Sequence, residues 1–208
     1  SHLSCADDTS SDYTSDQLMM FKSLTDDKKE QKSIANSAAI CAWPDSHYDW
    51  VRPGLMLYGV SPMLNEVESS VELLNTANIK PVMTLRSSLI AVRKVAKGDY
   101  VGYSAAWRAE EDTTIGVVAI GYGDGYPRHA NNGTPILING RKVPLVGRVS
   151  MDMITVDLGT NSKDKIGDLA TLWGNGLPIE EVARWATTIP YELLCNITRR
   201  VEINFTSR

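Results

Sequence analysis

The distribution of apolar residues changes near residue 78, and the part before that point has mixed helical and strand-like patterns. In TSDQLMMFKSLTDD (14–27), apolar residues recur at helical spacing, and Ser15 is placed to act as the N-cap. After the short apolar segment KSIANSAAICAW (32–43), the run DWVRPGLMLYGV (49–60) places Pro and Gly beside apolar residues. This pattern predicts a strand flanked by a tight loop. We therefore predict an α/β region over residues 1–77.

The part from residue 78 to residue 208 has the pattern of a β-domain. KPVMTLRSSLIAVRKV (80–95) alternates and is rich in β-branched residues, which predicts a strand. Asn139-Gly140 predicts a hairpin turn, because both positions tolerate a positive φ. Short strands broken by Gly, Asn and Asp predict an all-β domain of barrel type. Three further elements are expected near the end: a helix with Pro at its first turn in PIEEVARWAT (178–187), a short helix in YELLCNI, and a closing strand in RRVEINF.

Composition excludes several classes of protein. The net charge is −4 and no basic stripe stands out, which argues against nucleic acid as a partner. No apolar run approaches the roughly 20 residues that span a bilayer, so we expect no membrane segment. The three cysteines are widely spaced and form no CxxC, which argues against a disulfide framework or a zinc site and fits a reducing cytoplasm.

The α/β region is too short to form a closed barrel by itself. It holds only two or three βα units, whereas an eight-stranded α/β barrel needs about 250 residues. The sequence also begins at Ser1 without a methionine. We therefore expect these residues to be a piece of a longer protein.

Single motifs in the α/β region are open to two explanations. Arg52 in VRPG could hold an anion or a ring nitrogen, and the N–H groups of Gly54 and Leu55 could cradle a phosphate. Ser37 in NSAAI could bind phosphate or cap a helix. Taken alone, these motifs are explained more simply by a surface arginine beside a structural turn and by a capping serine.

Motifs in the β-domain are equally open when taken alone. IGYGDGYPR is not a phosphate loop, and a bulged strand end with a packed tyrosine explains it. In GRVSMDM, Arg148 and Asp152 flank Met151 and could form a structural ion pair. Tyr103 in VGYSAAW could be a packed ring at a strand end. The histidines assemble no Ser-His-Asp constellation, and no metal-ligand spacing occurs, so we expect no metal.

The order of the motifs is more specific than any one of them. A histidine followed five residues later by an aspartate opens the series. It continues with NSAAI, VRPGLMLYG, LRSSLIAVR, VGYSAAW, VVAIGYGDGYPR, VPLVGRVSMDM and YELLCNITRRV. Together these motifs resemble the alanine racemase family over nearly the whole chain.

The resemblance implies an enzyme that uses pyridoxal 5′-phosphate (PLP) to interconvert L- and D-alanine, which supplies D-alanine for peptidoglycan. It implies the C-terminal part of a PLP-binding (β/α)8 TIM barrel, followed by a β-barrel-like C-terminal domain. It also implies a cytoplasmic head-to-tail homodimer, in which each active site combines the barrel of one chain with the β-domain of the other.

The resemblance also assigns roles to residues. Tyr103 matches one of two acid/base groups, and Met151 matches the residue whose backbone N–H contacts the substrate carboxylate. Arg52 matches the donor to the pyridine nitrogen, and His2 packs against the cofactor ring. The phosphate contacts are Ser37, Gly54, Leu55 and Tyr191. The substrate access corridor is lined by Asp7, Tyr122, Arg128, Arg148 and Ile189.

These roles make chemical sense. Racemisation removes the Cα proton on one face and returns a proton on the other, which requires two proton-transfer groups on opposite sides. The cofactor supplies the electron sink. An arginine at the pyridine nitrogen leaves that nitrogen unprotonated, which discourages transamination. A tyrosine such as Tyr103 needs nearby positive charge to act as a base near neutral pH.

Two departures from the family pattern matter. The family's Schiff-base lysine, which is also the second proton-transfer group, lies upstream of everything in this sequence. We therefore predict that these residues alone do not racemise alanine. In addition, Ser104, Ala105 and Ala106 stand where relatives often carry glycine or threonine, and Ser104 adds a Cβ where glycine would permit a positive φ.

Other functions remain open. A broad-specificity amino-acid racemase or a basic amino-acid decarboxylase would share the fold, although Arg52 and Tyr103 argue against a decarboxylase. A β-domain that only dimerises is the non-catalytic alternative.

Overall fold

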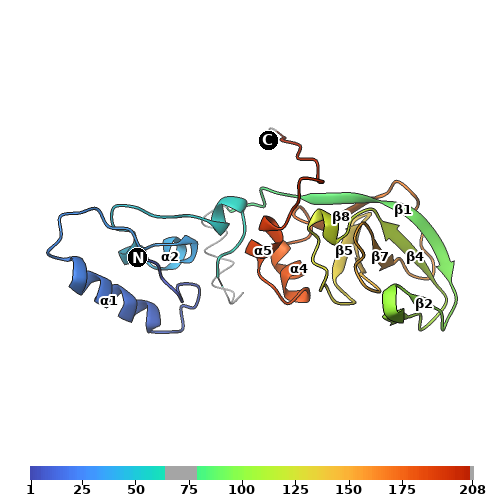
Figure 1. Cartoon of the computed structure of the whole chain (residues 1–208), viewed down its shortest axis with the longest axis horizontal. Coiled ribbons are helices and arrows are strands. Elements are labelled where there is room, and N and C mark those ends of the chain that lie inside the picture. Colours follow the sequence, from blue (N-terminus) through green and yellow to red (C-terminus); the bar gives the residue numbers. More distant parts are fainter. Residues whose placement is uncertain (64–78, 207–208) are drawn as a thin grey trace. The chain divides into compact units, whose positions relative to one another are not determined.

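The computed structural model describes residues 1–63 and 79–206, which belong to two compact units (Figure 1). The first unit is Ser1–Val82 and the second is Met83–Arg208. The domain boundary predicted between residues 77 and 78 lies outside the described residues.

The first unit contains short helices and few strand contacts. The predicted helix over 14–27 is α1 (Tyr13–Thr25), although Asp12 stands at its N-cap in place of Ser15. The strand predicted within 49–60 is reduced, among the described residues, to one parallel bridge between Ser33 and Trp50. Beyond the bridge, Pro53 and Gly54 turn the chain into a 3-10 helix. The other helical elements are α2 (Ser37–Ala42), η1 (Pro44–Ser46) and η2 (Leu55–Tyr58).

Three extended segments lie side by side in this unit, as strands of an α/β barrel do. The Ser1 amino group donates to the Ser33 carbonyl at 2.9 Å, and the Arg52 N–H donates to the Ala35 carbonyl at 2.9 Å. Apolar side chains from these segments and from α2 form one buried core. Its members are Leu3, Ala6, Ile34, Ala35, Ala38 and Ala39. The residues of this unit that were predicted for the site are therefore carried on backbone whose positions are set by a shared core.

The second unit is a six-stranded antiparallel sheet in the order β6-β5-β8-β1-β4-β7. Its two edge strands also meet, through an antiparallel bridge between Leu145 and Val156 and a hydrogen bond from the Val146 N–H to the Thr155 carbonyl at 2.9 Å. The sheet therefore closes into the predicted barrel. The strands are β1 (Leu85–Val95), β4 (Thr113–Val118), β5 (Pro135–Ile138), β6 (Arg141–Pro144), β7 (Ile154–Asp157) and β8 (Leu169–Trp173), and a separate ribbon pairs β2 (Tyr100–Val101) with β3 (Trp107–Arg108).

Local sequence signals for the second unit are mostly confirmed. Asn139 (φ 49°) and Gly140 (φ 77°) form the two-residue turn between β5 and β6. The two predicted helices are α4 (Ile179–Trp185), which follows Pro178, and α5 (Pro190–Cys195), and they lie next to one another (Figure 1).

The closing strand predicted in RRVEINF is wrong. In the described residues this segment has no strand, because its start is held against another loop. The Thr198 N–H donates to the Asp124 carbonyl at 3.1 Å, and the Arg200 side chain contacts Asp124 and Asp152. Side-chain and backbone contacts with the 121–124 turn therefore replace ladder pairing here.

No helix in residues 1–63 and 79–206 is both long and apolar enough to cross a membrane.

Two leucines of β8 test whether the barrel interior stabilises this unit. Leu172 is fully buried, whereas Leu169 is 58% exposed in the same strand. Leu172→Ala should lower the free energy of unfolding by about 2–5 kcal/mol, because it leaves a cavity in the core. Leu169→Ala is the matched control, and its effect should stay within about 0.5 kcal/mol. Urea unfolding of both variants measures the difference, and equal losses would contradict the assigned sheet register.

Candidate active site

Arg52 and His2 meet at the start of the first unit. One Arg52 guanidinium nitrogen donates to the Ser33 hydroxyl, and the other donates to the Ser1 carbonyl and lies 3.4 Å from His2 Nδ1. The described ion pairs do not include Arg52, so its partners here are uncharged oxygens and an imidazole. Its positive charge is therefore not neutralised by a carboxylate in this cluster.

Ser37 is linked to the Arg52 segment by a hydrogen bond from Gly54, which lies two residues after Arg52 in the sequence. The Ser37 side chain is buried, and its oxygen accepts from the N–H groups of Gly54 at 2.7 Å and Met56 at 3.4 Å. Because both bonds use oxygen lone pairs, the hydroxyl proton is left to donate outward. The N-cap of α2 is Asn36, whose side chain accepts from the Ala39 N–H at 3.0 Å, so capping does not explain Ser37.

Leu55 opens η2, and a 3-10 helix leaves its first N–H groups without partners inside the helix. The Leu55 N–H is thus placed, like the Ser37 hydroxyl, to donate to an anion. The structure therefore brings together His2, Ser37, Arg52, Gly54 and Leu55. Asp7, predicted for the corridor, lies outside this cluster, in the turn closed by the hydrogen bond from the Asp8 N–H to the Cys5 carbonyl.

Tyr103 lies at a groove of about 430 Å³ on the second unit. Its ring is 71% exposed, so the packed ring that the local motif favoured is wrong. Arg148 lines the same groove. The remaining lining residues are Gly102, Val117, Ser150, Met153, Ile154 and Thr155.

Met151 and Tyr122 continue this surface. The Tyr122 N–H donates to the Ser150 carbonyl at 3.0 Å, and the Gly123 N–H donates to the Met151 carbonyl at 2.8 Å. These bonds hold η4 (Tyr122–Asp124) against the 150–151 turn, and both the Tyr122 and Met151 side chains are exposed. The second tyrosine of the motif, Tyr126, is buried and stacks on Trp173, and burial raises its pKa far above the usual tyrosine range.

Arg200 is a residue that the sequence reasoning missed. Its guanidinium lies 3.2 Å from Asp124 and 2.5 Å from Asp152, and the hydrogen bond to Asp152 raises the arginine pKa. The ion pair suggested between Arg148 and Asp152 is thus replaced by one between Arg200 and Asp152. Nothing local in the sequence could have revealed it, since the partners are 48 residues apart.

Three predicted residues lie elsewhere on the second unit. Ile189 is the N-cap residue of α5, and Tyr191 lies within that helix. The segment after α5 reaches η4, where the Thr198 hydroxyl donates to the Gly123 carbonyl at 2.9 Å. Arg128 is exposed in the turn closed by the hydrogen bond from the Ala130 N–H to the Pro127 carbonyl. Ile189, Tyr191 and Arg128 are placed by this structure, but their roles stay predictions.

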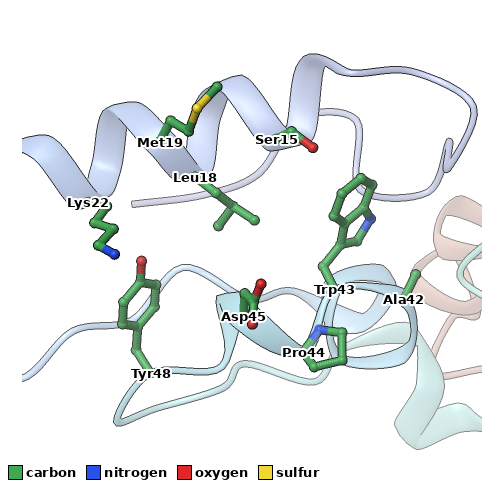
Figure 2. A pocket seen from close by; sticks show the side chains of 9 residues that line it. All are labelled: Ser15, Leu18, Met19, Lys22, Ala42, Trp43, Pro44, Asp45 and Tyr48. Atoms are coloured by element: carbon green, nitrogen blue, oxygen red, sulfur yellow. The ribbon is translucent and has the colours of Figure 1, made fainter.

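A second cavity, of about 730 Å³, lies in the first unit between α1 and residues 42–48 (Figure 2). The Lys22 ammonium and the Tyr48 hydroxyl point toward one another across it, beside Leu18 (Figure 2). Burial, with Asp26 and Asp45 nearby, raises the pKa of Tyr48. None of the nine described lining residues was predicted for the site, and the described residues hold no cluster suited to a metal ion.

Comparison with known protein families divides the chain at nearly the same place as the two structural units. The family described as alanine racemase, N-terminal domain, matches residues 1–62, and the family described as alanine racemase, C-terminal domain, matches residues 82–205. The two matched segments correspond to the two units of the structure. The chain belongs to the alanine racemase family.

Curated relatives and solved structures are similar over almost the whole chain. Alanine racemases of Photobacterium profundum and Vibrio cholerae are 57% and 53% identical over 205 residues, which is 99% of this chain and 56% and 55% of theirs. The biosynthetic alanine racemase of Pseudomonas aeruginosa is 45% identical with a TM-score of 0.92, covering 99% of this chain and 56% of that one. The Bartonella henselae alanine racemase with covalently bound pyridoxal phosphate is 34% identical with a TM-score of 0.84, covering 96% and 54%. The chain spans about half the length of the curated relatives it matches.

Replacing Arg200 tests whether it holds the η4 turn. Arg200→Met should lower the melting temperature by a few degrees at low salt, because two carboxylates lose their cation. The loss should shrink in about 1 M NaCl, where exposed charges are screened. The neighbouring Arg199→Met is the control and should show no salt-dependent difference. A salt-independent loss in Arg200→Met would point to packing in place of charge.

Proposed function

We propose that these residues form part of a PLP-dependent alanine racemase that interconverts L- and D-alanine. The observation that carries the proposal is Tyr103, which is exposed at a groove beside Arg148 although its sequence context favours a packed ring. The cluster of Arg52, Ser37 and Gly54 on the first unit gives independent support, because its guanidinium and its serine hydroxyl can donate to an anion.

The residues of the first unit fit PLP. Its phosphate would be held by the Ser37 hydroxyl and the Leu55 N–H, its pyridine nitrogen by Arg52, and its ring face by His2. The Gly54 N–H donates to the Ser37 oxygen in this structure, so it would contact the phosphate only after leaving that bond. The guanidinium of Arg52 carries donors and no acceptor, so it would donate a hydrogen bond to the ring nitrogen. When bound, PLP supplies the electron sink that allows the Cα proton of an amino acid to leave.

The residues of the second unit would act on the substrate. Tyr103 removes or returns the Cα proton on one face, and Arg148 lines the same groove. The Met151 N–H binds the alanine carboxylate. Tyr191 adds a phosphate contact, and access to the site runs past Asp7, Tyr122, Arg128, Arg148 and Ile189.

The proposal includes a homodimer with shared sites. Side chains around the groove and on α5 are exposed although they are aromatic or apolar, and a surface of this kind is typical of an interface. They include Tyr103, Tyr122, Met151, Met153, Ile189 and Tyr191. We propose that this surface of one copy meets the Arg52 cluster of the other.

The biological role follows from the reaction. We place the enzyme in the cytoplasm, where it would provide D-alanine for peptidoglycan. A broad-specificity amino-acid racemase is the alternative within the same chemistry, and activity on a panel of amino acids separates the two.

Joining this chain to the upstream segment of a relative tests the activity. The donor is the part of the Photobacterium profundum racemase that this chain does not cover. The joined chain with PLP should convert L-alanine to D-alanine, and Tyr103→Phe should lower kcat by about 10²- to 10⁴-fold, because one proton-transfer group is lost. Tyr100→Phe, on the neighbouring ribbon β2, is the control and should retain activity.

The same assay on the 208 residues alone should show no conversion even with excess PLP, because the second proton-transfer group is missing. Turnover by these residues alone, or full activity of Tyr103→Phe in the joined chain, would contradict the proposal.

Ser37 provides a test of cofactor binding that does not depend on activity. In the joined chain, Ser37→Ala should weaken PLP binding about tenfold, because a hydrogen bond to a charged phosphate is lost. Binding of pyridoxal, which has no phosphate, should change little. Titration followed by absorbance measures both affinities, and Ser23→Ala in α1 is the control. Equal losses for PLP and pyridoxal would show that Ser37 does not act on the phosphate.

A further inference from the structure

The backbone turn that carries Tyr103 packs directly on the turn that carries Arg148. A Cβ built on Gly102 would lie 3.0 Å from the Arg148 nitrogen and 3.1 Å from the Gly147 Cα. The two turns thus touch through backbone, with no side chain between them. Whatever holds one turn against the other therefore also sets where Tyr103 lies relative to Arg148.

The Tyr103 turn has an unfavourable backbone conformation. Ser104 has a φ of 60° and Ala105 a φ of 50°, in the left-handed region that side chains with a Cβ adopt at a cost. Such conformations persist only where neighbouring contacts hold them. The turn needs such a contact, since without one Ser104 and Ala105 would relax and carry Tyr103 with them.

Asn132 supplies contacts to both turns. Its Nδ2 donates to the Ala106 carbonyl at 3.1 Å, directly after the strained residues, and its Oδ1 accepts from the Gly147 N–H at 2.7 Å. A carboxamide offers one donor group and one acceptor, and these two bonds use one of each. An ionised Asp has no proton to donate to the Ala106 carbonyl. Ser is shorter, and its single oxygen cannot replace the two separate head-group atoms of Asn.

Asn132 is itself held by the barrel. The next residue, Gly133, donates its N–H to the Leu145 carbonyl at 2.8 Å, and the Thr134 hydroxyl donates to the Asn131 carbonyl at 2.7 Å. The Asn132 backbone is thus tied to the start of β5 and to the end of β6. Its side chain transmits that rigid position to the two turns.

We propose that Asn132 is a positioning residue, which holds the strained Tyr103 turn in register with Arg148 through its carboxamide. This inference rests on the proposed role of Tyr103 as an acid/base group. Asn132 touches neither substrate nor cofactor, so its effect should fall on the proton transfer made by Tyr103 and not on alanine binding.

The kinetic test uses the joined chain with PLP. Asn132→Ala and Asn132→Asp should each lower kcat about tenfold, because a displaced tyrosine transfers the proton less readily, with little change in KM. With Cα-deuterated alanine, the isotope effect should rise for the enantiomer whose proton Tyr103 removes. For the other enantiomer the isotope effect should fall. There the second proton-transfer group removes the labelled proton, and this removal limits the rate less once the Tyr103 step has become slower.

Asn131 offers a matched control. Its amide also donates to a backbone carbonyl, that of Trp185 at 3.0 Å, but in α4 and not in the Tyr103 turn. Asn131→Ala and Asn131→Asp should keep the parent kcat and isotope effects. Parent-like kinetics in both Asn132 variants would overturn the inference. A loss of kcat with an unchanged pair of isotope effects would overturn it as well, because that pattern shows a general structural defect.

Hydrogen exchange on the 208 residues separates this inference from the proposed function. Asn132→Ala should speed exchange at Gly147 and in residues 102–106, and Asn131→Ala should not. If the parent joined chain fails to racemise alanine, the proposed function is wrong, and the exchange result decides alone whether Asn132 holds the two turns. Unchanged exchange in Asn132→Ala would overturn that holding role.

Discussion

Closure of the six-stranded sheet is the constraint on which the second unit depends. The contact between Leu145 and Val156 joins the ends of the sheet, so no edge of the ladder is left open at this point. The turns that bear Tyr122 and Met151 lie beside strands of this sheet, whereas the Tyr103 turn lies between β2 and β3 of the separate ribbon and packs on the backbone of Gly147 and Arg148. The groove at Tyr103 combines loop residues with residues of β4 and β7, so the closed sheet supports one of its walls and loops supply the rest.

The two units contribute different chemistry. The first unit holds the hydroxyl of Ser37 and the guanidinium of Arg52 as donors, which suits a phosphate and a ring nitrogen. The second unit exposes a tyrosine beside an arginine, which suits a proton transfer near a carboxylate. In the described residues neither set makes a complete catalytic site by itself, and the proposed function adds a second copy and the upstream segment to complete it.

Features encoded by neighbouring residues could be predicted from the sequence. The turn at Asn139-Gly140 and the helix after Pro178 follow from backbone preferences of a few residues, and both are present. The strand order could not be predicted, because pairing of β5 with β8 and of β1 with β4 joins segments far apart in the chain. The alternating RRVEINF segment misled for the same reason, since contacts of Arg200 with distant aspartates determine its path.

The candidate site divides in a similar way. The order of motifs predicted catalytic or binding roles for Tyr103, Arg52 and Ser37, although the local pattern alone favoured structural roles for all three. The sequence held no signal for Asn132, because an asparagine before a glycine is typical of an ordinary turn. Its contacts with Ala106 and Gly147 exist only once β5, β6 and the Tyr103 turn have come together.

The central claim is that Tyr103 of one copy and the Arg52 cluster of another complete a single active site. Hybrid dimers of the joined chain test it most directly. Two variants that are each inactive, Tyr103→Phe and Arg52→Ala, would be unfolded together, refolded as a mixture and assayed for racemisation. A shared site predicts that activity returns, because one site of each hybrid then has both residues intact. A mixture as inactive as its components would show that Tyr103 and Arg52 act from the same copy, and would contradict the account.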